Sequence, residues 1–155
     1  MTPAVEAAKK AGLVFRIHQY RHDPAHPSYG EEAAEKLDID PARVFKTLVV
    51  KLDGRRLAVA VVPVSGLLDM KAAARALGGR RAEMAEAGEA QRATGYMLGG
   101  VSPLGQKRSL PTLIDESALT FETIFVSAGR RGLEMELKAQ ELAQSLNAGF
   151  APVSR

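Results

Sequence analysis

The pattern of hydrophobic and polar residues over positions 1–37 predicts a helix, a strand, a loop and a second helix. Residues 2–12 begin with a Thr-Pro pair, which favours a helix start, and end near a glycine, which favours a helix end. Residues 14–20 are rich in strand-forming side chains. Two prolines and a glycine make 21–30 a predicted loop, and Ser28 stands at capping-box spacing before Glu31, where the next helical pattern begins.

The strongest strand signal comes from two apolar runs separated by a turn sequence. Residues 45–52 (FKTLVVKL) and 57–64 (LAVAVVPV) lie on either side of Asp53–Gly54. We therefore expect a β-hairpin. Both runs are almost continuously apolar, which indicates burial on both faces.

The second half of the chain alternates between helical, glycine-rich and strand-like segments. Helices are predicted over 70–77 and 87–94, a long loop over 95–111, strands over 112–116, 120–128 and 133–137, and a closing helix over 138–149. This gives roughly six or seven strands, without the regular βαβ alternation of a doubly wound fold. The expected fold class is α+β: a single domain, residues 1–155, with a mixed, partly barrel-like β-sheet flanked by helices.

The amino-acid composition predicts a globular protein without a membrane span. The chain has 155 residues, of which 46% are hydrophobic and 25% charged, a balance typical of globular proteins. No stretch approaches the roughly 20 apolar residues of a membrane span, and the N-terminus lacks the apolar core of a secretory signal. We expect a cytoplasmic protein with no membrane partner.

The absence of cysteine and the positive net charge limit which kinds of site the chain can form. The chain contains no cysteine, which excludes disulfides, thiolate nucleophiles and cysteine-based metal sites. The formal net charge is +3, and basic residues occur in adjacent pairs. Pairs gathered on one face would bind phosphates, whereas scattered pairs would only be solvated, and both interpretations stay open. The pairs are Lys9/Lys10, Arg55/Arg56, Arg80/Arg81, Lys107/Arg108 and Arg130/Arg131.

Three histidines, His18, His22 and His26, lie within nine residues and raise the question of a metal site. A metal needs side chains that converge on one point, whereas this segment runs from a predicted strand into a loop with two prolines. A chance cluster is the favoured interpretation, and we expect no metal and no cofactor.

The glycine-rich segment 99–105 resembles two catalytic motifs without matching either. A Walker A loop would need its lysine one residue before Lys107, and Arg108 stands where Ser or Thr would bind magnesium. A nucleophile elbow around Ser102 would use the backbone N–H of the next residue, but Pro103 has none. What remains is a loop whose backbone N–H groups can approach an anion or a developing oxyanion.

Two side chains outside that loop are candidate site residues. Lys46 lies at the head of an apolar run, and is either an edge residue whose stem reaches water or a charge that meets an anionic ligand. The pattern alone favours the first interpretation. Tyr20, at the end of its predicted strand, is either a core residue or a hydroxyl directed at a site.

Five separated blocks of the sequence carry a more specific signal. They are TPAVEAAKKAGLVFRIHQYRHDP, VFKTLVVKLDG, LAVAVVPVSGLLDMKAAARALG, QRATGYMLGGVSPLGQKRSLPTLID and VSAGRRGLEMEL. In order and spacing they resemble the YbaK family, bacterial deacylases of Cys-tRNA(Pro) that are free-standing relatives of the editing domain in prolyl-tRNA synthetase. The resemblance implies a YbaK-like fold, the acceptor end of tRNA(Pro) as substrate, and prolyl-tRNA synthetase as partner.

The resemblance also implies roles for individual residues. Lys46 would meet the phosphate or ribose at the tRNA 3′ end, and the loop Gly99–Pro103 matches the family's G-x-x-x-P loop, whose backbone surrounds the aminoacyl ester. Two positions depart from the family, because Glu134 replaces an aspartate and Tyr29 replaces a phenylalanine. We expect catalytic roles for Lys46, Gly99, Gly100, Val101 and Ser102, and substrate contacts from Tyr20, Tyr29, Thr47, Pro103 and Glu134.

The mechanism proposed for the family needs no nucleophile from the protein. The thiol of the substrate's own cysteine attacks its ester carbonyl, which releases the tRNA and leaves a cyclic thiolactone. Catalysis then consists of holding thiol and carbonyl in attack geometry and stabilising the oxyanion with loop amides. Two alternatives stay open: a deacylase for another mischarged tRNA such as Ala-tRNA(Pro), and a non-catalytic tRNA- or synthetase-binding module.

Overall fold

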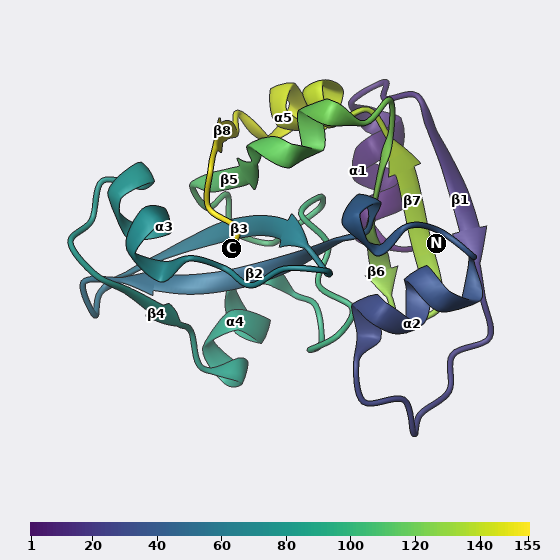
Figure 1. The fold of residues 1–155 in the computed structure, drawn as a ribbon, viewed down its shortest axis with the longest axis horizontal. Helices are drawn as coiled ribbons and strands as arrows, with labels where there is room; N and C mark the ends of the chain where they lie inside the picture. Colours follow the sequence, from purple (N-terminus) through teal and green to yellow (C-terminus); the bar gives the residue numbers. More distant parts are fainter.

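A computed structural model describes residues 1–155, and a long hairpin runs from one end of the molecule to its middle (Figure 1). The hairpin consists of β2 (Phe45–Leu52) and β3 (Arg56–Pro63), which pair antiparallel. Asp53 and Gly54 both adopt positive φ, +54° and +67°, as a tight hairpin turn requires. The hairpin predicted from the sequence is confirmed, and β3 is buried along nearly its whole length.

The hairpin belongs to a mixed sheet of five strands, in the order β4–β2–β3–β5–β8. The short strand β4 (Ala82–Met84) pairs antiparallel with the end of β2 only. On the other side, β5 (Thr112–Asp115) runs parallel to β3, and β8 (Gly149–Ala151) runs parallel to β5. The first half of β2 therefore has no strand on its outer side, and this edge is where the candidate site lies.

A second sheet of three antiparallel strands packs against the hairpin. Its order is β1 (Phe15–Gln19), β7 (Leu133–Leu137) and β6 (Ile124–Arg130). The largest core cluster joins the two sheets, because it contains side chains of β2, β3, β6 and β7 together with those of three helices. The predicted α+β class with a mixed sheet is confirmed; the strands form two sheets rather than a closed barrel.

Five helices cover the sheets, and the sequence signals for them are confirmed. Thr2, Ser28 and Asp69 each accept a hydrogen bond from a backbone N–H in the first turn of the helix they precede. None of the helices has both the length and the apolar character needed to cross a membrane. The helices are α1 (Pro3–Lys10), α2 (Tyr29–Lys36), α3 (Met70–Ala76), α4 (Ala87–Thr94) and α5 (Ala139–Leu146), with 3₁₀ turns η1 (Pro41–Arg43) and η2 (Glu116–Thr120).

Most boundaries lie within two residues of the predicted ones, and two differ more. The strand expected from residue 120 begins at Ile124, because Thr120 belongs to η2, where its hydroxyl donates to the carbonyl of Ser117. The closing helix expected to reach residue 149 ends at Leu146, because Asn147 turns the chain with a left-handed φ of +53°. The residues that follow form β8, which the sequence analysis missed along with β4.

Candidate functional site

A cavity of about 180 Å³ lies beside the unpaired first half of β2. The first turn of α2, the glycine-rich loop after α4 and the β6–β7 hairpin close its other sides. The cavity therefore brings together segments that lie far apart in the sequence. Seven of the ten predicted site residues line it: Tyr20, Tyr29, Lys46, Thr47, Gly99, Val101 and Glu134.

The glycine-rich loop offers backbone donors at the cavity wall. The N–H of Gly100 donates to the carbonyl of Met97 at 2.9 Å and is therefore already used. The N–H groups of Gly99 and Val101 donate to no acceptor within the protein. Because both residues line the cavity, their amides are available to an oxygen that carries negative charge.

Ser102, Pro103 and Gly100, the other three predicted residues, lie behind the cavity wall and do not line it. Ser102 is fully buried, and its hydroxyl accepts a hydrogen bond from the N–H of Leu104 at 3.2 Å. Its carbonyl accepts another from the side chain of Gln106. The Ser102 side chain thus shapes the loop from behind, and this placement gives it no access to a ligand in the cavity.

Gly99 has a steric reason to be glycine. Its φ is +88°, and a Cβ there would lie 2.6 Å from Cδ2 of Tyr29. The ring of Tyr29 is in turn covered by the guanidinium of Arg131, whose carbon lies 3.7 Å from the ring centroid. Nε and Nη2 of Arg131 are buried without a hydrogen-bond partner. The loop and the ring therefore form one packed wall of the cavity, and the guanidinium holds the ring without lining the cavity itself.

The polar groups of β2 at the cavity are incompletely paired. Nζ of Lys46 donates to the carbonyl of Gly66 at 3.0 Å and forms no ion pair. Partial burial lowers the pKa of this ammonium, while the nearby charge of Glu31 acts in the opposite direction. The hydroxyl of Thr47 is buried and has no hydrogen-bond partner. Both side chains are thus poised to contact a polar ligand.

Glu134 is the most perturbed acid of the cavity. It stands on β7 opposite Ser127 of β6 and His18 of β1, and only 6% of it is exposed. Burial raises the pKa of its carboxyl to about 8. Tyr20 reaches the same cavity from the end of β1, and burial raises the pKa of its phenol too. At neutral pH the cavity therefore holds a mostly protonated carboxylic acid and a neutral phenol.

The histidines of the N-terminal segment do not converge on one point. His18 contacts Glu136 at 2.9 Å, and His26 contacts Glu35 at 3.1 Å. His22 contacts the fully buried Glu32 at 2.7 Å. Each ring thus packs against a different carboxylate.

Glu32 anchors the loop between β1 and α2. Its carboxylate also accepts from the N–H of Asp23 at 2.7 Å and lies 3.3 Å from Nζ of Lys36. Burial acts to raise its pKa, but the hydrogen bonds from His22, the Asp23 amide and Lys36 outweigh this and hold it at about 2. This cluster fixes the loop that leads to Tyr29 at the cavity.

Sequence reasoning missed several lining residues. Ser127 and Leu48 carry no motif, and they reach the cavity only through strand pairing. Arg131 was noted only as half of a basic pair, because its contact with Tyr29 depends on how the β6–β7 hairpin meets α2. Gly30 has a steric reason to be glycine, since a Cβ there would lie 2.3 Å from a methyl carbon of Val64, but this contact arises only when the chain has folded.

Comparison with known proteins identifies a matching family and two relatives of similar sequence. A family model described as "Aminoacyl-tRNA editing domain" matches residues 23–144. EbsC of Enterococcus faecalis, a proposed Cys-tRNA(Pro)/Cys-tRNA(Cys) deacylase, is 34% identical over 99% of this chain and 93% of its own length. The uncharacterized protein YwhH of Bacillus subtilis is 29% identical over 74% of this chain and 72% of its own.

Solved structures share the fold. The crystal structure of a proposed trans-editing enzyme for prolyl-tRNA synthetase matches with a TM-score of 0.85 at 23% identity, over 100% of this chain and 99% of that one. A crystal structure of a hypothetical protein matches with a TM-score of 0.86 at 25% identity, over 99% of both chains. The α+β arrangement of two sheets is thus one that other proteins adopt over their whole length.

Proposed function

Because the chain belongs to the aminoacyl-tRNA editing domain family and is an aminoacyl-tRNA deacylase, we propose that it hydrolyses Cys-tRNA(Pro) in trans and uses the substrate's own thiol as nucleophile. The observation that carries the proposal is the composition of the cavity. It offers two unused backbone amides and a lysine, but no side-chain nucleophile joined to a base. Its volume of about 180 Å³ suits a small amino acid rather than a large one.

The hydroxyls in the cavity are poor nucleophiles. The hydroxyl oxygen of Ser127 accepts from the N–H of Gly129 at 3.1 Å, and no base accepts its proton. The Thr47 hydroxyl has no hydrogen-bond partner at all. An unactivated hydroxyl reacts slowly with an ester, whereas the thiol of a bound cysteine is intrinsically more nucleophilic.

The proposed reaction rearranges bonds within the substrate. The cysteine sulfur forms a bond to its own ester carbonyl carbon, and the bond from that carbon to the 3′ oxygen of the tRNA breaks. The thiol proton ends on the departing 3′ oxygen, so tRNA leaves as an alcohol and the amino acid as a four-membered thiolactone. Water then opens the thiolactone to free cysteine. No oxidant and no cofactor enters this balance.

Each part of the cavity has a role in this scheme. The amides of Gly99 and Val101 donate to the oxyanion that forms when sulfur attacks. Lys46 binds the phosphate or ribose of the terminal nucleotide. The ring of Tyr29, held in place by Arg131, confines the cysteine side chain so that sulfur and carbonyl stay in attack geometry, a positioning effect that can be worth about 7–11 kcal/mol.

The test is a deacylation assay with Cys-tRNA(Pro) beside Ala-tRNA(Pro). The proposal predicts rapid release of cysteine, much slower release of alanine, and a large loss of kcat/KM for Lys46→Ala on the cysteine substrate. Prolyl-tRNA synthetase, the proposed partner, is added in a second series to show whether it raises the rate. Faster release of alanine would identify Ala-tRNA(Pro) as the substrate in place of Cys-tRNA(Pro). Release of neither amino acid would refute the proposed function.

A further inference from the structure

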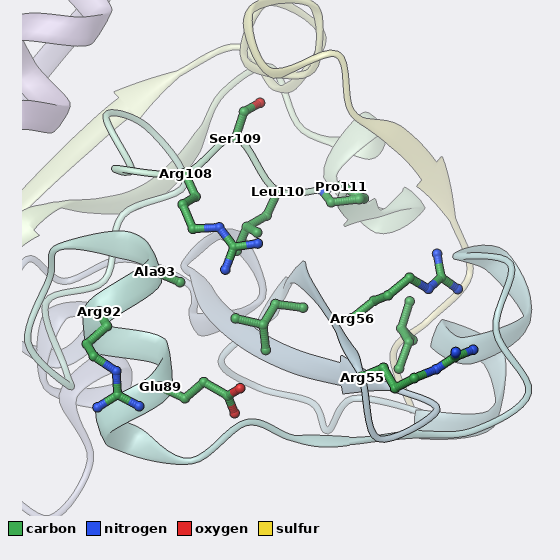
Figure 2. Close-up of a pocket in the computed structure, with 11 residues that line it drawn as sticks. Arg55, Arg56, Glu89, Arg92, Ala93, Arg108, Ser109, Leu110 and Pro111 are labelled. Carbon is green, nitrogen blue, oxygen red and sulfur yellow. The ribbon is translucent and has the colours of Figure 1, made fainter.

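A second and larger cavity lies away from the site described above. It measures about 560 Å³ and opens between α4, the turn of the β2–β3 hairpin and the segment that follows the glycine-rich loop. Figure 2 shows Arg108 reaching from that segment toward the middle of the cavity, with Arg55 and Arg56 at the hairpin turn and Arg92 on α4. Four arginines therefore border one hollow, and Arg108 is the one directed at its middle.

The positive charge of this arginine cavity is only partly balanced by the protein, since the carboxylate of Asp53 at the hairpin turn interacts with Arg55 and Arg56 without forming an ion pair. None of the four guanidinium groups forms an ion pair. Glu89 is the only carboxylate of the lining, and it already pairs with Lys51 at 3.1 Å. The chain as a whole carries a formal net charge of only +3, so the four arginines concentrate positive charge at one place.

The backbone holds this cluster in place. The N–H of Arg108 donates to the carbonyl of Ala93 at 3.0 Å, and the N–H of Lys107 donates to the carbonyl of Thr94 at 3.0 Å. These bonds fasten the segment that carries Arg108 to the last turn of α4, which carries Arg92. The floor of the cavity is formed by the buried leucines Leu52, Leu57 and Leu110, and the arginines face solvent at its rim together with Ser109 and Pro111.

The arginine cavity lies at a definite distance from the candidate site. Lys46 borders the first cavity and Leu52 the second, and both are on β2. Six residues of extended strand span roughly 20 Å. That is about six stacked nucleotides at roughly 3.4 Å each. The helix α4 joins the two places as well, because Arg92 precedes the loop glycine Gly99 by seven residues.

We propose that the arginine cavity binds the phosphate backbone of the acceptor arm of the same tRNA whose charged 3′ end occupies the first cavity. This proposal rests on the proposed function. Guanidinium groups match phosphate oxygens geometrically and stay charged at every physiological pH. The rim offers no exposed aromatic anchor of the kind that dominates protein–protein interfaces, which favours a polyanion over a protein as the occupant.

The test compares a long and a short substrate. The double variant Arg92→Gln/Arg108→Gln removes two guanidinium groups from exposed positions and should leave the fold intact, which a thermal melt verifies. With full-length aminoacyl-tRNA, kcat/KM at low salt should fall about tenfold, and the slope of log kcat/KM against log salt should become shallower by about 1.5. With an aminoacylated CCA trinucleotide, too short to reach the arginine cavity, both values should stay as in the wild type.

A matched control removes the same charge elsewhere. Lys71→Gln/Arg75→Gln changes two exposed positions of α3, a helix that packs through Ala73 on an apolar face of β2 and β3, and it should leave both substrates unaffected. An equal loss in this control, or an equal loss on both substrates, would overturn the proposal. A loss seen only when prolyl-tRNA synthetase is present would also overturn it and assign the cavity to a protein.

Binding of uncharged tRNA separates this proposal from the proposed function. If wild-type protein binds the tRNA with a salt slope that falls by about 1.5 in the double variant, the arginine cavity is confirmed even where no deacylation occurs. If the wild type deacylates its substrate and the double variant binds tRNA unchanged, the arginine cavity is refuted and the proposed function stands.

Discussion

Substitution of Glu134 by glutamine should change how stability depends on pH. The buried carboxyl has a pKa of about 8 in the folded protein, against an ordinary value of 4.5. A raised pKa means that the folded state holds a proton that the unfolded state has released, so folding is progressively penalised as pH rises from 4.5 to 8. Glutamine keeps the shape of the protonated acid but cannot ionise, so the variant lacks this penalty.

The size of the effect follows from the two pKa values. At 1.36 kcal/mol for each pKa unit, the penalty on wild-type stability is about 1 kcal/mol at pH 5, about 3 at pH 7 and about 5 at pH 9, where it levels off. The difference in free energy of unfolding between Glu134→Gln and the wild type should grow by these amounts. Other groups titrate equally in both proteins and cancel from the difference.

Urea denaturation followed by far-UV circular dichroism provides the measurement, because the chain has no tryptophan to report by fluorescence. Glu136→Gln is the matched control on the same strand. Hydrogen bonds from Thr123 and His18 overcome the effect of burial and lower the pKa of Glu136, so its contribution to stability is present above the ordinary pKa and is lost at low pH. A Glu134→Gln difference that does not change between pH 5 and pH 9 would refute the buried, protonated carboxyl.

Three further substitutions test the cavity and the loop that borders it. Gly99→Ala should lower kcat about 100-fold while the fold persists, since its Cβ would lie 2.6 Å from the Tyr29 ring and displace the loop amides. Unchanged single-turnover rates would refute a catalytic role for these amides. Arg131→Gln should raise KM about fivefold or more, because it removes a cation–π contact worth about 1 kcal/mol, and it should change kcat less. An unchanged KM would refute this positioning role. Glu32→Gln should lower the free energy of unfolding at pH 7 by about 1–3 kcal/mol, because it leaves buried donors poorly paired. This loss of stability should shrink as pH falls toward 2, where the wild-type carboxylate becomes protonated. A loss that is constant with pH would contradict the low pKa of Glu32.

The sequence predicted those parts of the fold that depend on local interactions. Thr2, Ser28 and Asp69 cap helices because a side-chain oxygen near a helix start satisfies a free N–H whatever the rest of the chain does. The strands β4 and β8 have three residues each, and they exist only because a longer strand pairs with them. No periodicity can develop over three positions, so these strands were missed.

The candidate site likewise contains residues that the sequence pointed to and contacts that only the fold creates. Resemblance led to Lys46, Gly99 and Glu134, and these residues line one cavity. The contact of Arg131 with Tyr29 joins a hairpin turn to a helix start some hundred residues away, and nothing local marks it. The arginine cavity likewise combines separate basic pairs with Arg92, whose proximity only the fold determines.

The claim that the substrate supplies the nucleophile has one direct test, which is single-turnover deacylation of tRNA(Pro) charged with cysteine, with serine or with S-methylcysteine. Serine keeps the size of the side chain and S-methylcysteine keeps the sulfur, but neither offers a free thiol. We expect cysteine to be released at least about 100-fold faster than either, because only cysteine carries a free thiol that can attack the ester carbonyl. Equal rates for the three substrates would contradict a nucleophile supplied by the substrate.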